Sequence, residues 1–257
     1  MSSGTAARQV SGATSVDAIL TELRRLGRRD RREVAAWYFP SAMTTFGVAA
    51  PDLRRLARAS ARELRLAPAA RVLRLARGLV AARNTDARTC AYEILSRHPA
   101  AMAALDERGV TALGRGNDNW GSVDAFAVLV AGAAWRAGRI SDDVIARWAA
   151  SKDRWWRRTA LVATVPLNAR SRGGRGDVLR TLLVCERLVG DRDDMVVKAL
   201  SWALRELAKH EAAAARAFLE RHASALAPRV VREVTNKLRT GRKNPRATPA
   251  AGAARRP

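Results

Sequence analysis

Two short segments combine aromatic and charged side chains at a spacing that could support chemistry. The first places Trp120 four positions before Asp124, and the second places Lys198 four positions before Trp202. On a helix, residues four apart share a face. Each segment therefore predicts a surface on which an indole ring lies beside a charge, and such a surface suits ligand binding better than core packing.

Each candidate also has an ordinary interpretation. Asp124 follows a turn rich in glycine and asparagine, and an acidic residue in the first turn of a helix often only complements the helix dipole. Trp202 stands in an almost wholly apolar stretch, where core packing is the usual role. Arg157 and Arg158 are adjacent, so only one of them can face a given phosphate, and a solvated basic face explains the pair equally well.

The charge of the chain favours a polyanionic partner. Among 257 residues there are 47 Lys and Arg against 24 Asp and Glu, which gives a net charge of +23. Genomic base composition can replace Lys by Arg, but it does not explain an excess of bases over acids. We therefore expect nucleic acid as the partner. No apolar run is long enough for a secretory signal or a membrane span, so we expect no membrane contact.

Several kinds of catalytic site find no support in the residue spacing. The three histidines and two cysteines lack metal-ligand spacing, so Cys90 and Cys185 are interpreted as small core residues in a reducing cytoplasm. There is no glycine-rich phosphate loop, serine elbow or Cys-His arrangement. We expect no metal and no cofactor, and any chemistry must use a carboxylate and aromatic faces.

The apolar pattern predicts an all-α fold. Apolar residues recur three and four positions apart from residue 16 to about residue 238, and most prolines fall between these periods. The sequence from Asp153 to Arg158 is echoed forty positions later from Asp193 to Lys198, with a looser echo at Asp86. This period is typical of stacked helix pairs, and it predicts a curved superhelix of HEAT-like repeats with a concave basic face.

The composition also suggests the domain boundaries. Residues 16–239 form a single expected domain, which a disordered segment precedes at 1–15. Residues 240–257 contain five basic residues, three prolines and no acids, so we expect a disordered basic tail there.

Several motifs of aromatic, basic and acidic residues occur in order along the chain. They are Trp37-Tyr38, Phe46-Gly47-Val48, Asp52-Leu53-Arg54-Arg55-Leu56, Trp120-Gly121-Ser122-Val123-Asp124, Trp155-Trp156-Arg157-Arg158-Thr159-Ala160 and Lys198-Ala199-Leu200-Ser201-Trp202-Ala203-Leu204-Arg205-Glu206. Together they resemble the motifs of the AlkD-type DNA glycosylases, alkylpurine repair enzymes built from HEAT-like repeats. The resemblance covers about residues 35–238. It departs at Asn119, where family members often carry an aromatic residue, and in the Arg-rich stretch from Arg24 to Arg32.

The resemblance implies a role for each matching residue. Asp124 falls on the catalytic aspartate, Trp120 and Trp202 on the two cleft tryptophans, Arg158 on the phosphate-contacting arginine and Tyr38 on a cleft tyrosine. We also expect Arg157 and Lys198 to contact DNA.

The activity implied is hydrolysis of the N-glycosidic bond of cationic 3-alkyladenine and 7-alkylguanine in double-stranded DNA, as a step of base excision repair. Lys198 is the only lysine near these motifs, so we expect water as the nucleophile and no Schiff base. We expect a monomer in the cytoplasm, associated with the bacterial nucleoid. Two alternatives stay open: a non-catalytic HEAT-repeat protein that binds damaged or distorted DNA, and a repeat scaffold that binds acidic proteins.

Overall fold

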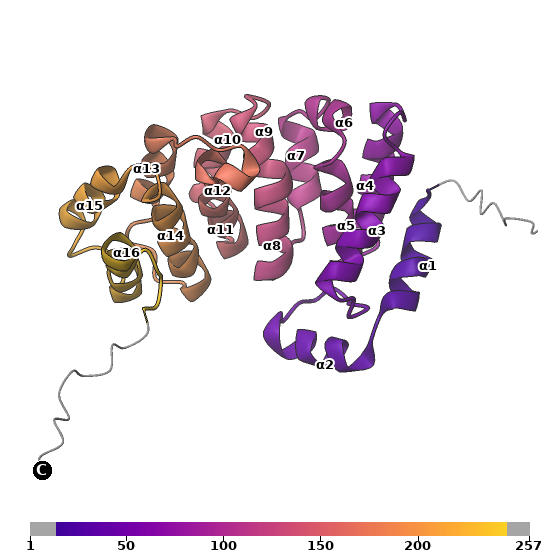
Figure 1. Cartoon of the computed structure of the whole chain (residues 1–257), viewed down its shortest axis with the longest axis horizontal. Coiled ribbons are helices and arrows are strands. Elements are labelled where there is room, and N and C mark those ends of the chain that lie inside the picture. Colours follow the sequence, from indigo (N-terminus) through magenta and orange to yellow (C-terminus); the bar gives the residue numbers. More distant parts are fainter. Residues whose placement is uncertain (1–13, 246–257) are drawn as a thin grey trace, which may run out of the picture. The chain divides into compact units, whose positions relative to one another are not determined.

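The computed structural model describes residues 14–245, and these residues form helices joined by short connections (Figure 1). Within them there is no β-strand, only an isolated bridge between Thr44 and Asn84. The all-α prediction is confirmed. The predicted segment 1–15 and the tail 240–257 lie largely outside the described residues. Within these residues, no helix is both long and apolar enough to cross a membrane.

The chain divides into two compact units, and each is described by itself. The first comprises residues up to 105 and residues 111–125, and the second comprises residues 106–110 and those from 126 onward. Helices α7 and α8 have residues in both units. The helices of the first part of the chain are α1 Val16–Leu26, α2 Arg29–Tyr38, α3 Ala50–Glu63, α4 Ala69–Ala81, α5 Thr85–Leu95, α6 Pro99–Ala103, α7 Glu107–Gly114 and α8 Trp120–Phe126.

The second part begins with a π-helical turn, η1 Ala127–Ala131, in which the N–H of Gly132 bonds to the carbonyl of Ala127. Gly132 is required there, because a Cβ atom would collide with the carbonyl oxygen of Ala163. The remaining elements are α9 Gly132–Arg136, α10 Asp142–Ala149, α11 Arg154–Val162, α12 Val165–Asn168, η2 Arg170–Arg172, α13 Val178–Arg187, α14 Asp194–Leu207, α15 Ala212–Arg221 and α16 Pro228–Thr240.

Each unit has its own apolar core. In the first unit α3 and α4 pack on α5, and the core contains Leu79 and the fully buried Tyr92. In the second unit α10 and α14 pack on α11, and α13 and α16 pack on α14. Cys90 and Cys185 are both fully buried and unpaired by disulfides, as the sequence predicted.

Helix α2 differs from the other long helices because none of its residues is buried. Figure 1 shows it running across the lower ends of α1 and α3 rather than alongside them. Its exposed apolar side chains include Val34, Trp37 and Tyr38. Helix α2 therefore contributes exposed surface to the first unit but almost nothing to its buried core.

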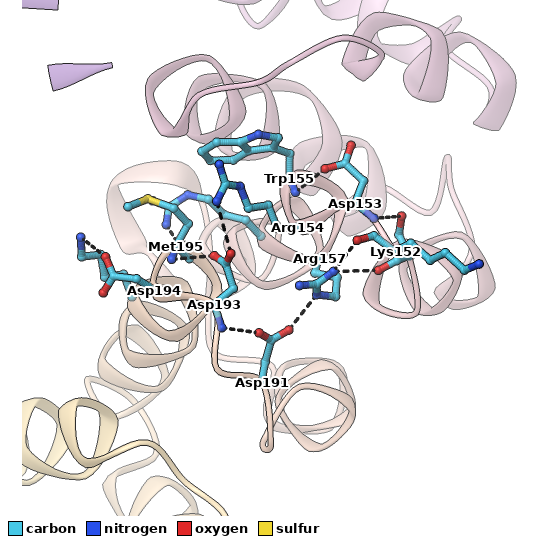
Figure 2. Close-up of polar contacts among 12 residues, drawn as sticks. Lys152, Asp153, Arg154, Trp155, Arg157, Asp191, Asp193, Asp194 and Met195 are labelled. Atoms are coloured by element: carbon cyan, nitrogen blue, oxygen red, sulfur yellow. Dashed lines mark hydrogen bonds and ion pairs between the residues drawn. The ribbon is translucent and has the colours of Figure 1, made fainter. Parts of the chain in front are cut away.

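The forty-residue echo has a structural basis. Asp153 is the N-cap of α11 and Asp193 is the N-cap of α14, and each carboxylate accepts a bond from the backbone N–H two residues later, at 2.9 Å in both cases (Figure 2). Aspartate is among the preferred N-cap residues because its side chain satisfies an otherwise unpaired N–H. Asp86, the looser echo, lies inside α5, whose N-cap is Asn84.

Candidate functional site

Helix α8 carries the first group of candidate residues, and Asn119 fixes where this helix begins. The Asn119 side chain is 3% exposed and accepts a hydrogen bond of 2.9 Å from the N–H of Ser122. Asn119 therefore acts as the N-cap of α8. Because α8 starts at Trp120, Asp124 is its fifth residue and lies beyond the first turn. The helix-dipole explanation for Asp124 loses its basis, since the dipole effect fades within one turn.

The ring of Trp120 is held by contacts from the end of α2. Its Nε1–H donates to the carbonyl of Tyr38 at 3.2 Å, and the Tyr38 ring meets it edge-on at a centroid separation of 5.3 Å. Phe39 lies closer, at 4.4 Å and a tilt of 33°. Trp120 is partly exposed despite these contacts. Its remaining surface is therefore presented in a fixed orientation.

Two residues that the sequence analysis missed complete this arrangement. The Asp118 carboxylate accepts hydrogen bonds from the Ser41 hydroxyl at 2.5 Å and from the Ala42 N–H at 2.6 Å. Phe39 packs so closely on α8 that a Cβ atom at Gly121 would lie 2.9 Å from its ring. The aromatic run from residue 37 to residue 39 was a signal for Phe39, but nothing in the local sequence connected Asp118 to residues 41 and 42.

The Asp124 carboxyl group lies one helical turn after Trp120, on the same face of α8. Asp124 is partly exposed, so solvent or a ligand reaches it. In the first unit, Tyr38, Trp120 and Asp124 thus occur together at one end of α2 and the first two turns of α8. Trp120 and Asp124 therefore share a face of one helix, as their spacing predicted.

Helix α11 in the second unit carries the two arginines, and they point to different partners. Arg157 donates from Nε to Asp191 at 2.7 Å and from Nη1 to the carbonyls of Ser151 and Lys152 at 3.0 and 2.9 Å (Figure 2). Arg158 is 5% exposed and donates to the carbonyl of Met195 at 2.5 Å. The expectation that adjacent arginines face different partners is confirmed.

Helix α11 also carries two tryptophans and a third arginine, Arg154. The Arg154 guanidinium lies over the Trp155 ring at 4.9 Å and also pairs with Asp193 at 3.4 Å. Trp156 packs on Trp148 of α10 with a centroid separation of 4.9 Å. The basic and aromatic groups of α11 therefore tie this helix to both of its neighbours.

Helix α14 places Trp202 on its less buried face. Met195, Lys198, Trp202 and Arg205 recur three and four positions apart, and all four are half-buried, whereas most residues between them are buried. The Lys198 ammonium pairs with Asp194 at 2.6 Å. Trp202 is therefore neither wholly a core residue nor fully exposed. Its half-exposed ring shares a face with two basic side chains.

The candidate residues thus form two groups, one in each unit. Tyr38, Trp120 and Asp124 belong to the first, and the second contains Arg157, Arg158, Lys198 and Trp202, on the packed pair α11 and α14. Within residues 14–245, no group of three or more His, Cys, Asp or Glu side chains could hold a metal ion.

Comparison with known proteins assigns this chain to a family. Residues 19–238 match the family model described as DNA alkylation repair enzyme. A solved structure described as "predicted DNA alkylation repair enzyme from Enterococcus faecalis" superimposes with a TM-score of 0.63 over 82% of this chain and 95% of that one, at 15% sequence identity. At that identity the likeness shows a shared fold. No curated protein sequence matches.

Proposed function

The chain belongs to the DNA alkylation repair enzyme family, and from this premise we propose that it is a monofunctional DNA glycosylase. Family membership indicates a role in the repair of alkylated DNA. The proposed reaction is hydrolysis of the N-glycosidic bond of cationic purines, namely 3-alkyladenine and 7-alkylguanine, in double-stranded DNA. We propose that it acts in base excision repair, as a monomer in the cytoplasm.

One observation carries the proposal. Asp124 is a partly exposed carboxylate in the second turn of α8, and it shares its face with an oriented indole ring. A carboxylate beside an aromatic face matches a reaction in which positive charge develops on a sugar.

The proposed reaction needs few catalytic groups. A purine alkylated at ring nitrogen 3 or 7 carries a positive charge, so it leaves as a neutral base without a general acid. Charge then develops on the deoxyribose as an oxocarbenium-like cation. Asp124 would stabilise that cation more than the ground state and would orient the attacking water.

The two tryptophans would assist through their electron-rich faces. A cation over an indole face is stabilised by about 0.5 to 2 kcal/mol, depending on how dry the site is. Trp120 is suited to this because its hydrogen bond and its ring contacts fix the orientation. Trp202 offers a half-exposed ring on the basic face of α14.

We assign the phosphate contacts to Arg158, Arg157 and Lys198, with Tyr38 beside the deoxyribose. Arg158 lies on α11, which packs on α14, the helix that carries Lys198 and Trp202. The Arg157 guanidinium bonds to Asp191 and to two backbone carbonyls, so we assign it the smallest share of DNA binding. The Lys198 ammonium is engaged by Asp194, which is consistent with a phosphate contact rather than a nucleophile.

The test is base release from a duplex that contains a single 7-methylguanine, followed by heating in alkali to reveal abasic sites. Asp124→Asn keeps the size of the side chain and removes its charge, so it should abolish release and leave DNA affinity nearly unchanged. The matched control is Asp143→Asn, which removes an exposed carboxylate near the start of α10 and should release base like the parent protein. Full activity of Asp124→Asn would remove this residue from the mechanism.

The same experiment separates the alternatives. A glycosylase produces abasic sites, whereas a non-catalytic protein that binds damaged or distorted DNA only retards the duplex in a gel. A scaffold for acidic proteins does neither.

A further inference from the structure

The side chains of helix α2 are exposed to a degree that is typical of a binding surface and unusual for a helix that packs in a core. Trp37 is 80% exposed, Val34 62% and Tyr38 51%, and the ten residues of α2 include none that is buried. A helix of this length is only marginally stable in water on its own. Large apolar side chains gathered on such a helix indicate a surface that meets a partner.

The N-terminal end of α2 is fixed to a loop. The Arg28 N–H donates to the Gly47 carbonyl at 3.3 Å. That loop is itself held by Asp86, which accepts bonds from the Thr45 hydroxyl at 2.9 Å and from the Phe46 N–H at 2.7 Å. Gly47 has a φ of +74°, which favours glycine at this turn.

The C-terminal end of α2 is fixed to the start of α8. Trp120 bonds to the Tyr38 carbonyl, and Asp118 holds Ser41 and Ala42 just beyond the helix. Since no residue of α2 is buried, these two ends carry its attachment to the first unit. The helix is a strap: its ends are anchored, Arg32 reaches the Phe46 carbonyl, and most other side chains along its length face solvent.

The positive charge of the strap favours a polyanion as its partner. Residues 24–33 contain six arginines against Asp30 and Glu33. Arg28 pairs with Asp30 and Arg29 with Glu33, both at 3.0 Å, and all four side chains are more than 60% exposed. Ion pairs this exposed contribute little and are easily exchanged for contacts with phosphate.

We propose that α2 is a DNA-binding strap on which Trp37 packs against the deoxyribose of one strand while the neighbouring arginines contact the flanking phosphates. The identity of the polyanion rests on the proposed function. Trp37 stacks on Tyr38 at 6.1 Å, and Tyr38 in turn meets Trp120 at 5.3 Å. Three neighbouring rings therefore lead from the strap to the face of α8 that carries Asp124.

Thiol labelling tests the contact directly. Trp37→Cys puts one reactive thiol on the strap, because Cys90 and Cys185 are fully buried and burial raises the pKa of the Cys90 thiol to about 12 and that of Cys185 as well. The matched control is Leu66→Cys, since Leu66 is also 80% exposed. It lies past the far end of α3, a 14-residue helix, and so about 20 Å from the strap along that helix.

Saturating undamaged duplex should slow maleimide labelling of the Trp37→Cys protein at least tenfold and that of the Leu66→Cys protein less than twofold. Equal rates with and without duplex for Trp37→Cys would overturn the proposal. A slowing that is the same in both variants would also overturn it, because the protection would then not be specific to the strap.

Affinity measurements separate this inference from the proposed function. Trp37→Ala should weaken binding of undamaged duplex about fivefold to tenfold whatever its sequence, with Trp37→Tyr restoring most of the loss and Leu66→Ala having no effect. The thermal midpoint should stay unchanged, since the side chain is exposed. If the parent protein releases no base, the proposed function fails, yet the Trp37→Ala loss still stands. If the parent releases base and Trp37→Ala binds duplex equally well, the strap alone is refuted.

Discussion

The indole N–H of Trp120 donates to the backbone carbonyl of Tyr38 at 3.2 Å, and the two rings meet edge to face at 5.3 Å. The first turn of α8 and the last residue of α2 are thereby locked together. The orientation of the candidate catalytic tryptophan depends on a helix that has no buried residue of its own. Contacts made by α2 can therefore influence the orientation of Trp120, which shares a face of α8 with Asp124.

Replacing Trp120 by Phe keeps an aromatic face but removes the donor to Tyr38. We expect the free energy of unfolding to fall by about 1 kcal/mol, the usual net value of one hydrogen bond. Release of 7-methylguanine in single turnover should slow by up to about tenfold, because a phenyl face attracts a cation less than an indole face does. Trp120→Ala should lower both the free energy of unfolding and the rate of base release further than Trp120→Phe does. Parent-like release by Trp120→Phe would show that the oriented indole is not needed.

The N-cap of α14 provides a second prediction, on stability. Asp193 caps the helix through the Met195 N–H and also pairs with Arg154. Asp193→Ala should lower the free energy of unfolding by about 1 to 2 kcal/mol and Asp193→Asn by only a few tenths. Denaturant unfolding measures both. A larger loss in Asp193→Asn than in Asp193→Ala would contradict the capping role.

Apolar periodicity predicted where helices occur better than which side of a helix is buried. Around α13 the period formed by Val178, Leu179, Leu182 and Leu183 predicted a helix, and a helix from residue 178 to residue 187 is present. Yet Leu179 is 84% exposed and Leu183 41%, while Val184 and Cys185 are buried. The buried face is chosen by packing against α10 and α14, which a local period does not contain.

In the candidate site, too, the sequence predicted the local relations between residues but not the long-range contacts. The four-residue spacing placed Trp120 and Asp124 on one helical face, because that relation is local. Asp118 and its partner Ala42 are 76 positions apart, and neither stands in a periodic segment. Contacts of this kind arise from loops that the tertiary fold brings together, so nothing in the sequence marked them. The curvature of a superhelix and its concave basic face stay predictions.

The salt dependence of DNA affinity distinguishes the basic residues of α11 and α14. If the Lys198 ammonium exchanges Asp194 for a phosphate, Lys198→Ala should lower the slope of log affinity against log salt by about one unit, and Arg158→Ala should do the same. Arg157→Ala should change the slope less and stability more, since it leaves Asp191 without its 2.7 Å partner. Arg170→Ala, on the exposed turn η2, serves as a charge-matched control. Equal slopes for Lys198→Ala and the parent would exclude the contact.

The raised pKa of Asp86, which holds the loop that anchors α2, predicts that the free energy of unfolding depends on pH. Burial raises the pKa of the Asp86 carboxyl above its ordinary value of 3.8, and hydrogen bonds from Thr45 and the backbone of Phe46 and Gly47 oppose that rise. Above pH 3.8 the folded protein therefore retains a proton that the unfolded chain has released. The folded state binds more protons, so this carboxyl lowers the free energy of unfolding as pH rises towards its folded pKa.

Asp86→Asn should remove that contribution. The three bonds from Thr45, Phe46 and Gly47 all end on Oδ2, so an amide oxygen in that place can accept them without carrying a charge. Relative to the parent, the variant should become more stable as pH rises above 3.8 towards the raised folded pKa of Asp86, whereas Asp86→Ala should be less stable throughout because it loses the acceptor. Denaturant unfolding at several pH values measures this difference. Parallel pH profiles for the parent and Asp86→Asn would mean that the carboxyl titrates alike in both states.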